Sequence, residues 1–255
     1  MRHLYAVREG KGPMVVLSHA LGCDLHMWDG LTAILAPHFE VLRYDHRNHG
    51  KSEVMVDPFA VETLADDAAT LIREHAHGVP VHFVGLSMGG MTAQALAVRC
   101  PELLSSVTIA NSSAHYPDRT PWRGRVDMVR AHGVNAIATG AVARWLTPEY
   151  VHTPDGAEAS KRLYEALVST DPQGYIASCQ AVASIDFRES NRHIRAPTLV
   201  IAGTRDEATP IAMSQEIASA VPNAKLVTIE GAHLSAVERP AEFSALLTTF
   251  WKSLS

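Results

Sequence analysis

An apolar strand that runs directly into a glycine-flanked serine is the feature that most constrains this chain. Residues 81–90 read Val-His-Phe-Val-Gly-Leu-Ser-Met-Gly-Gly, and apolar residues continue at helical spacing over 88–99. Glycines on both sides of Ser87 are needed where a strand and a helix approach closely, because neighbouring side chains would clash. The segment therefore predicts a sharp strand-turn-helix elbow with Ser87 exposed at its tip.

Short apolar runs alternate with helical stretches along most of the chain. This alternation is typical of parallel strands connected by helices on both faces of a sheet. The predicted strands are 15–19, 41–44, 81–84, 107–110, 198–202 and 226–229. The predicted helices are 64–75, 88–99, 213–220 and 241–252, the last with an apolar stripe of Phe243, Leu246, Leu247, Phe250 and Trp251.

The stretch 112–194 breaks this alternation. It contains helix-like pieces at 125–132, 157–169 and 175–183, separated by prolines, and no evident strand. A chain of 255 residues is within the range of one large α/β domain. We therefore expect an α/β core made of residues 1–111 and 195–255, with a helical cap inserted at 112–194.

The charge balance limits the partners of the protein. A net charge of -5 provides no basic face for nucleic acid or anionic lipid, so neither is expected as a partner. No apolar run resembles a signal peptide or approaches the length of a membrane span. Three cysteines (Cys23, Cys100 and Cys179) cannot all pair internally and lack metal-ligand spacing. We expect a soluble protein of the cytoplasm.

A nucleophilic serine requires a base, and the base requires an acid that orients it. Asp206 follows the predicted strand 198–202, and His233 follows the strand 226–229, in the chain order serine, acid, histidine. Both would reach the carboxyl edge of the sheet, where Ser87 also lies. The alternative is that Asp206 caps a helix and His233 is one of 14 ordinary histidines. The ordered set favours a catalytic triad of Ser87, Asp206 and His233.

Two glutamates are alternative acids. We expect Glu207 to point away on the same loop as Asp206, and Glu230 to belong to the preceding strand. Asp206 is therefore preferred.

An oxyanion site requires backbone N–H donors beside the serine. The N–H of Met88 at the start of the helix supplies one, and the loop after the strand 15–19 places the N–H of Leu21 as the second. We expect His19 to be a structural residue that hydrogen-bonds this loop, not a second base.

These motifs resemble the α/β-hydrolase superfamily over nearly the whole chain and, more narrowly, the 3-oxoadipate enol-lactonase family. The matching segments are LSHALGCDLHMWD at 17–29, LRYDHRNHGKS at 42–52, HFVGLSMGGMTAQ at 82–94, ARWLTPEY at 143–150, APTLVIAGTRDEATP at 196–210 and GAHLSAVERP at 231–240. The first segment, GLSMGGM and ARWLTP point to the lactonase branch. The resemblance implies an α/β-hydrolase fold and the opening of an enol-lactone in the β-ketoadipate pathway.

The chain departs from the family pattern at two places. Asn48 stands where glycine is usual, and we expect the turn to survive because asparagine tolerates a left-handed backbone. His19-Ala20 stands where many superfamily members have His-Gly.

An enol-lactone of this kind carries a free carboxylate, for which an arginine is the preferred partner. We predict that Arg125 or Arg144 binds the carboxylate and that Trp122 and Trp145 wall the pocket. The alternative is that these arginines are solvated and the tryptophans belong to the core of the cap. The chemistry needs no cofactor and no metal, and the partner is a small ester or lactone.

Other functions share some of these features. A broad carboxylesterase or a cofactor-free perhydrolase or haloperoxidase would use the same triad, whereas a carbon-carbon hydrolase usually has more glycines in the oxyanion loop. A non-catalytic binding protein can also have this fold, although such proteins often lose a triad member. The close histidine pairs, His75 with His77 and His46 with His49, lack further ligands for zinc, and we expect them on solvated loops.

Overall fold

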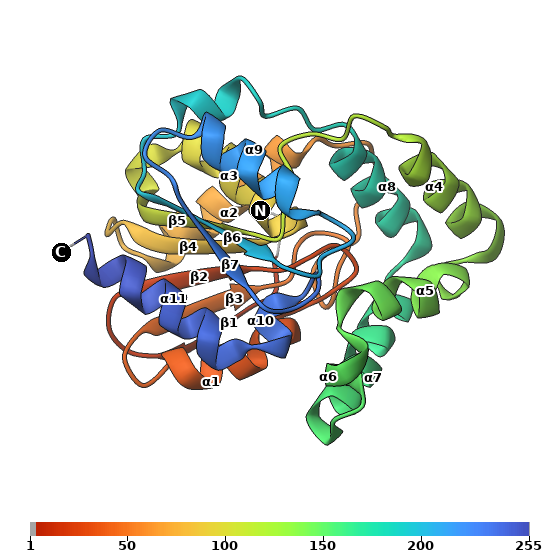
Figure 1. Cartoon of the computed structure of the whole chain (residues 1–255). Helices are drawn as coiled ribbons and strands as arrows, with labels where there is room; N and C mark the ends of the chain where they lie inside the picture. The colour runs from red at the N-terminus through yellow and green to blue at the C-terminus, as the bar shows by residue number, and fades with distance from the viewer. Residues whose placement is uncertain (1–3, 255) are drawn as a thin grey trace.

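The computed structural model describes residues 4–254, whose strands form one seven-stranded sheet (Figure 1). The strand order is β1-β3-β2-β4-β5-β6-β7, with β1 antiparallel to β3 and the other neighbouring pairs parallel. The strands are β1 Ala6–Gly10, β2 Met14–Ser18, β3 Glu40–Tyr44, β4 Val81–Leu86, β5 Leu104–Ala110, β6 Thr198–Gly203 and β7 Lys225–Ile229. The predicted fold class, α/β with a mostly parallel central sheet, is confirmed.

The six predicted strands are all present, with slightly different ends. The sequence did not predict β1, which pairs only with β3 at the edge of the sheet. Its residues, Ala-Val-Arg-Glu-Gly, are half-buried or exposed and contain no apolar run. The central strands β2 and β6 are buried along their whole length, which is why their apolar runs were readable.

Helices cover both faces of the sheet (Figure 1). One face carries α1 Asp29–Leu35 and α11 Pro240–Lys252, and the other carries α2 Val61–His75, α3 Met88–Arg99 and α9 Ile211–Ala220. The predicted stripe of α11 is buried except for Leu246, which is only partly covered. Within residues 4–254, no helix combines the length and apolar character that crossing a bilayer requires.

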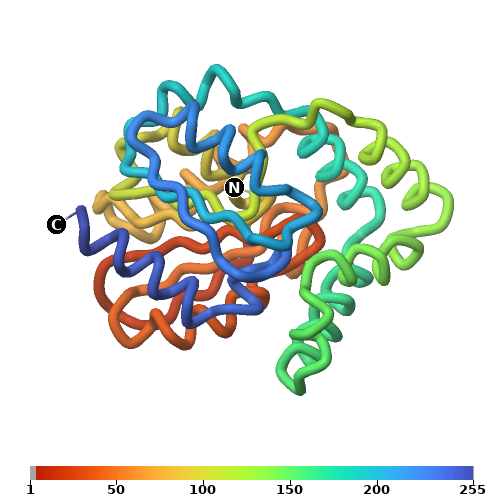
Figure 2. The backbone as a smooth tube through the Cα atoms, viewed as in Figure 1, coloured from red at the N-terminus to blue at the C-terminus, as the bar shows by residue number. Residues whose placement is uncertain are grey.

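The chain from α4 to α8, between β5 and β6, forms a group of helices beside the sheet, which Figure 2 shows as a segment coloured from yellow-green through green to teal. These are α4 Thr120–His132, α5 Asn135–Trp145, α6 Pro148–Val151, α7 Pro154–Val168 and α8 Pro172–Ala183. The three helical pieces predicted here overlap α4, α7 and α8, but each helix begins earlier than predicted. The prolines expected to separate the pieces lie in the first turns of these helices, where a missing N–H costs nothing.

The elbow after β4 depends on very close approach of three elements. A Cβ atom on Gly85 would lie 2.0 Å from the carbonyl oxygen of Gly89, and one on Gly89 would lie 2.0 Å from that of Ser18. Backbone atoms therefore occupy the space that side chains would need. This approach fixes Ser87 at the carboxyl edge of the sheet, as the sequence predicted.

Gly89→Ala is expected to lower the free energy of unfolding by about 2–3 kcal/mol, because the added methyl group meets the backbone of β2. Urea denaturation followed by circular dichroism measures the change. Gly124→Ala in α4 is the matched control, since no atom lies within 4 Å of the added Cβ. That control should gain roughly 0.5–1 kcal/mol from helix propensity. Equal stability of Gly89→Ala and the parent would contradict the packing argument.

Candidate active site

Ser87 has a left-handed backbone conformation between β4 and α3. Its φ is 58° and its ψ is -114°, and the residue is 8% exposed. Its N–H donates to the carbonyl of Ala110 at 3.0 Å, and its carbonyl accepts from the hydroxyl of Ser112 at 2.8 Å. The serine hydroxyl does not cap α3, so it is available to face other groups.

His233 and Asp206 meet Ser87 in a continuous hydrogen-bonded series. His233 Nε2 lies 2.9 Å from Ser87 Oγ, and His233 Nδ1 lies 2.9 Å from Asp206 Oδ2. A carboxylate can only accept, so Nδ1 carries the proton and Nε2 is left as the acceptor toward the serine. The structure thus brings together the three residues predicted from their order in the chain.

Four further donors surround the carboxylate of Asp206. The N–H groups of Ala208 and Thr209 donate to Oδ1, and the Thr209 hydroxyl and the Asn111 amide donate to Oδ2. Burial by itself would raise the pKa of this carboxyl, but His233 and these hydrogen bonds outweigh it and lower the pKa to about 2. Asp206 is therefore ionised and cannot rotate freely.

Sequence reasoning missed Asn111, which is fully buried directly after β5. Its amide nitrogen donates to Asp206 and to the carbonyl of Ala232, and its amide oxygen accepts from the Ser235 hydroxyl at 2.6 Å. One side chain thereby joins the acid to the loop that carries His233. Its position at a strand end, like those of Ser87 and Asp206, was the signal that could have identified it.

The two predicted oxyanion donors are the N–H groups of Met88, which follows Ser87, and of Leu21, which lines the same hollow as Ser87. Met88 is the first residue of α3, so its N–H has no partner within the helix. Among the hydrogen bonds of residues 4–254, the N–H of Leu21 has no acceptor. Leu21 and Ser87 line the same hollow, and the N–H of Gly89 donates to the carbonyl of His19 at 3.1 Å, which ties the loop to α3.

His19 orients the peptide group that contains the Leu21 N–H. The backbone N–H of His46 donates to His19 Nε2 at 2.9 Å, so Nδ1 carries the proton and donates to the carbonyl of Ala20 at 2.8 Å. That carbonyl and the N–H of Leu21 belong to one peptide plane and point in opposite directions. Burial lowers the pKa of His19 to about 4, which keeps the ring neutral. His19 is a structural residue of the loop, as predicted.

The expectation that His46 and His49 lie on a solvated loop was wrong. Both side chains are 1% exposed, and His49 Nε2 accepts from the N–H of Gly22 at 3.0 Å. Burial lowers the pKa of His49 to about 3, so this acceptor is unprotonated near neutral pH. Among the described residues, no group of three or more histidines, cysteines, aspartates or glutamates could hold a metal ion.

Asn48 has the left-handed backbone that was expected where the family has glycine. Its φ is 69°, and its side-chain oxygen accepts from the N–H of Met55. The departure from the family pattern is therefore accommodated without loss of the turn.

A hollow of about 400 Å³ opens above Ser87 and His233. The four residues predicted to contact substrate, Trp122, Arg125, Arg144 and Trp145, all line it. Trp145 is buried, Arg125 is half-buried and Arg144 is exposed. The Arg125 guanidinium lies over the Trp122 ring, 4.9 Å from its centroid.

Tyr116, which the sequence did not single out, also lines this hollow. Its ring packs edge-on against Trp122 with the centroids 5.2 Å apart. Burial raises the pKa of its phenol, so Tyr116 stays a neutral hydrogen-bond donor in the pocket.

One expectation about the alternative acids was wrong. Glu207 is among the residues that line the hollow, and within residues 4–254 it forms no hydrogen bond to His233. Glu230 is exposed and lies after β7, which ends at Ile229. Asp206 is the carboxylate that contacts His233.

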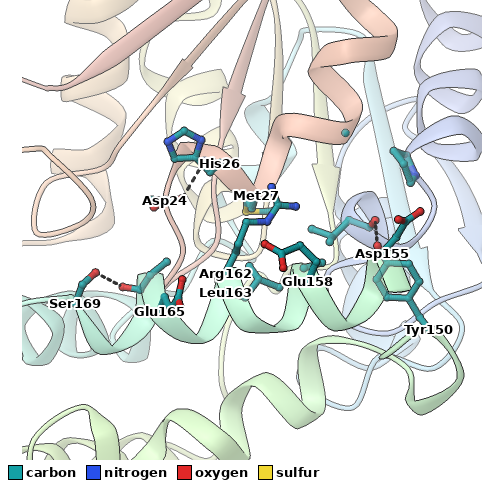
Figure 3. A pocket seen from close by; sticks show the side chains of 15 residues that line it. Asp24, His26, Met27, Tyr150, Asp155, Glu158, Arg162, Leu163, Glu165 and Ser169 are labelled. Carbon is teal, nitrogen blue, oxygen red and sulfur yellow. Dashed lines mark hydrogen bonds between the residues drawn. The ribbon is translucent and has the colours of Figure 1, made fainter. Parts of the chain in front are cut away.

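A larger hollow of about 650 Å³ lies between α7 and the turn that precedes α1. In Figure 3, Arg162 and Glu158 project from α7 toward the side where Asp24 and His26 lie. None of the predicted site residues lines this hollow, so it is separate from the site around Ser87.

Comparisons with known proteins find relatives over nearly the whole chain. A family model described as alpha/beta hydrolase fold matches residues 13–240. The chain is 34% identical over 232 residues to 3-oxoadipate enol-lactonase 2 of Acinetobacter baylyi, covering 91% of this chain and 86% of the relative. It is 31% identical over 242 residues to 3-oxoadipate enol-lactonase 1 of the same organism, covering 95% of this chain and 90% of the relative. The crystal structure of the enol-lactonase from Burkholderia xenovorans matches with a TM-score of 0.92 at 34% identity, covering 98% of this chain and 96% of that structure's chain.

The low pKa of Asp206 predicts a pH dependence of stability. In an unfolded chain an aspartate has a pKa of ~3.9. The stabilisation of the folded state that follows from the lowered pKa of Asp206 is therefore complete above that pH, and it is lost as the pH falls toward 2. A shift from 3.8 to about 2 corresponds to roughly 2 kcal/mol. Urea denaturation from pH 6 to pH 2 should show that the free energy of unfolding falls more steeply for the parent than for Asp206→Asn. Parallel curves for the two proteins would contradict this assignment.

Proposed function

The chain belongs to the α/β-hydrolase fold family and is an enzyme that cleaves esters or lactones, and we propose that its substrate is 3-oxoadipate enol-lactone. The observation that carries the proposal is the hydrogen-bonded series Ser87–His233–Asp206, which opens into a pocket lined by two arginines, Arg125 and Arg144. Such an activity would give the enzyme a role in the β-ketoadipate pathway.

The proposed mechanism begins with attack of Ser87 Oγ on the lactone carbonyl while His233 Nε2 takes its proton. Asp206 stabilises the imidazolium that forms. The negative charge that develops on the carbonyl oxygen is held by the N–H groups of Leu21 and Met88, in a site that is already arranged before the reaction.

Collapse of the tetrahedral adduct breaks the ring C–O bond, and His233 returns the proton to the enol oxygen. The leaving group remains tethered to the acyl group, so the intermediate is a single acyl chain on Ser87. Water then attacks the acyl carbonyl with His233 as base, and one linear oxo-dicarboxylate is released.

Arg125 is the better placed of the two arginines to bind the substrate carboxylate. Within residues 4–254, neither Arg125 nor Arg144 forms an ion pair, so both are available to an anion. Arg125 is half-buried and stacked on Trp122, which limits its motion. It also lies near the hydroxyl of Tyr175, a residue that is 1% exposed.

We also propose that residues 112–194 act as a cap on a core formed by 1–111 and 195–255. The cap contributes Trp122, Arg125, Arg144 and Trp145 to the pocket, whereas the core contributes Ser87 and His233. Substrate specificity would then reside mainly in the cap, and the chemistry in the core.

The first test is hydrolysis of 3-oxoadipate enol-lactone, followed spectrophotometrically beside p-nitrophenyl acetate. The lactone should have the higher kcat/KM, and Ser87→Ala should reduce turnover of both about 10⁴-fold to 10⁶-fold. Turnover of the simple ester without turnover of the lactone would overturn the substrate assignment and favour a broad carboxylesterase. Turnover that survives in Ser87→Ala would overturn the serine mechanism.

The second test concerns the carboxylate. Arg125→Met should reduce kcat/KM for the anionic lactone about 10-fold to 100-fold, mainly through KM, because a charge-assisted hydrogen bond is lost. Hydrolysis of the neutral p-nitrophenyl acetate serves as the internal control and should change little. Arg144→Met, at an exposed position of the same pocket, should have the smaller effect on the lactone. An unchanged KM in Arg125→Met would contradict this role.

A further inference from the structure

The loop that carries His233 is held from both sides by contacts that lead to the cap. His233 lies between β7 and α10 Ser235–Glu238. On one side, the N–H of Leu234 donates to the carbonyl of Trp145 at 2.8 Å. On the other side, the N–H of Ala232 donates to Glu238 Oε1 at 2.7 Å.

The second oxygen of Glu238 continues this connection into the cap. Thr147 Oγ1 donates to Glu238 Oε2 at 2.5 Å, across 91 positions of sequence. Thr147 also caps α6, because its side-chain oxygen accepts from the N–H of Tyr150. The residues that flank His233 are thus both connected to the short segment 145–147 that joins α5 to α6.

These contacts are shielded from solvent. Thr147 and Glu238 are each 6% exposed, and Trp145 is 7% exposed. Each carboxylate oxygen of Glu238 has one protein donor, so loss of either donor would leave a buried charged oxygen without compensation. Hydrogen bonds in such dry surroundings resist displacement more than those at the surface.

We propose that Thr147 and Glu238 are positioning residues that couple the seating of the cap to the alignment of His233. The inference rests on the proposed role of His233 as the general base. Proton transfer requires Nε2 to stay within hydrogen-bond reach of Ser87 Oγ, and a misplacement of about 1 Å can cost about 100-fold in rate. Trp145 makes the coupling direct, because the same residue lines the pocket and holds Leu234. A substrate that packs against Trp145 therefore contacts the segment that is hydrogen-bonded to the loop of His233.

The chain offers a matched pair of threonines for the test. Thr147 and Thr153 each precede a proline, cap the N-terminus of a helix and accept from the N–H three residues later. Only Thr147 also donates to Glu238; the Thr153 hydroxyl donates to the carbonyl of Tyr150. Valine at either position removes a helix cap, but only Thr147→Val removes the contact to the loop of His233.

The experiment measures kcat, KM and melting temperature for both variants with p-nitrophenyl acetate, so that its outcome does not depend on the identity of the lactone. Thr147→Val should lower kcat about tenfold with KM nearly unchanged. It should also move the acid limb of the kcat/KM profile to lower pH. A looser contact between His233 and Asp206 stabilises the imidazolium less, which lowers the pKa of His233. Thr153→Val should lower the melting temperature without either kinetic change.

Glu238→Gln provides an independent check, since it retains an acceptor for Ala232 and removes the charge that Thr147 bonds. It should reproduce the kinetic effect of Thr147→Val, and the two substitutions together should cost less than the product of their separate effects. The inference is overturned if Thr147→Val and Glu238→Gln keep the parent kcat and pH profile whatever happens to their melting temperatures. Failure of the lactone to react, by contrast, would affect only the proposed substrate.

Discussion

The close packing of β2, β4 and α3 holds Ser87 in a backbone conformation that residues with side chains rarely adopt, and the site depends on this constraint. Such a conformation costs on the order of 1–3 kcal/mol and persists only where its surroundings enforce it. Here the conformation is enforced by backbone contacts at Gly85 and Gly89 and by hydrogen bonds to the N–H and to the carbonyl of Ser87. The result is a fixed position for the proposed nucleophile at the N-terminus of a helix, where partial positive charge favours an oxyanion.

The other parts of the site are fixed to this serine by buried polar groups whose protonation states follow from their surroundings. Burial keeps His19 and His49 neutral, and a neutral imidazole can donate with one nitrogen and accept with the other. Each ring uses one nitrogen on the backbone of the loop 20–22 and the other on the backbone of residues 46–47. Asp206 is instead kept ionised, because His233 and the hydrogen-bond donors around its carboxylate outweigh the effect of burial.

The sequence predicted those parts of the fold and site that depend on local patterns. Ser87, Asp206 and His233 each follow a predicted strand, so their meeting at one edge of the sheet could be inferred from the order of strands. Contacts made by residues with no such signal could not be inferred. Tyr116 and Glu238 carry no motif that marks them, and the link from Glu238 to Thr147 spans 91 positions. His46 and His49 are buried by segments that no local pattern identifies. Asn111 does follow a strand, but its hydrogen bond to Asp206, 95 positions away, could not be inferred from that position alone. The polar edge strand β1 likewise lacked the apolar run on which strand prediction relies.

The account requires a covalent acyl intermediate on Ser87, and its direct observation is the most informative measurement. The enzyme is mixed with p-nitrophenyl acetate, quenched in acid within milliseconds to seconds, digested and analysed by peptide mass spectrometry. The account predicts an acetyl group on Ser87 that appears with an initial burst of nitrophenol and disappears as the substrate is exhausted. Acetylation of another residue in place of Ser87, or rapid turnover with no acylated serine at any time, would contradict it.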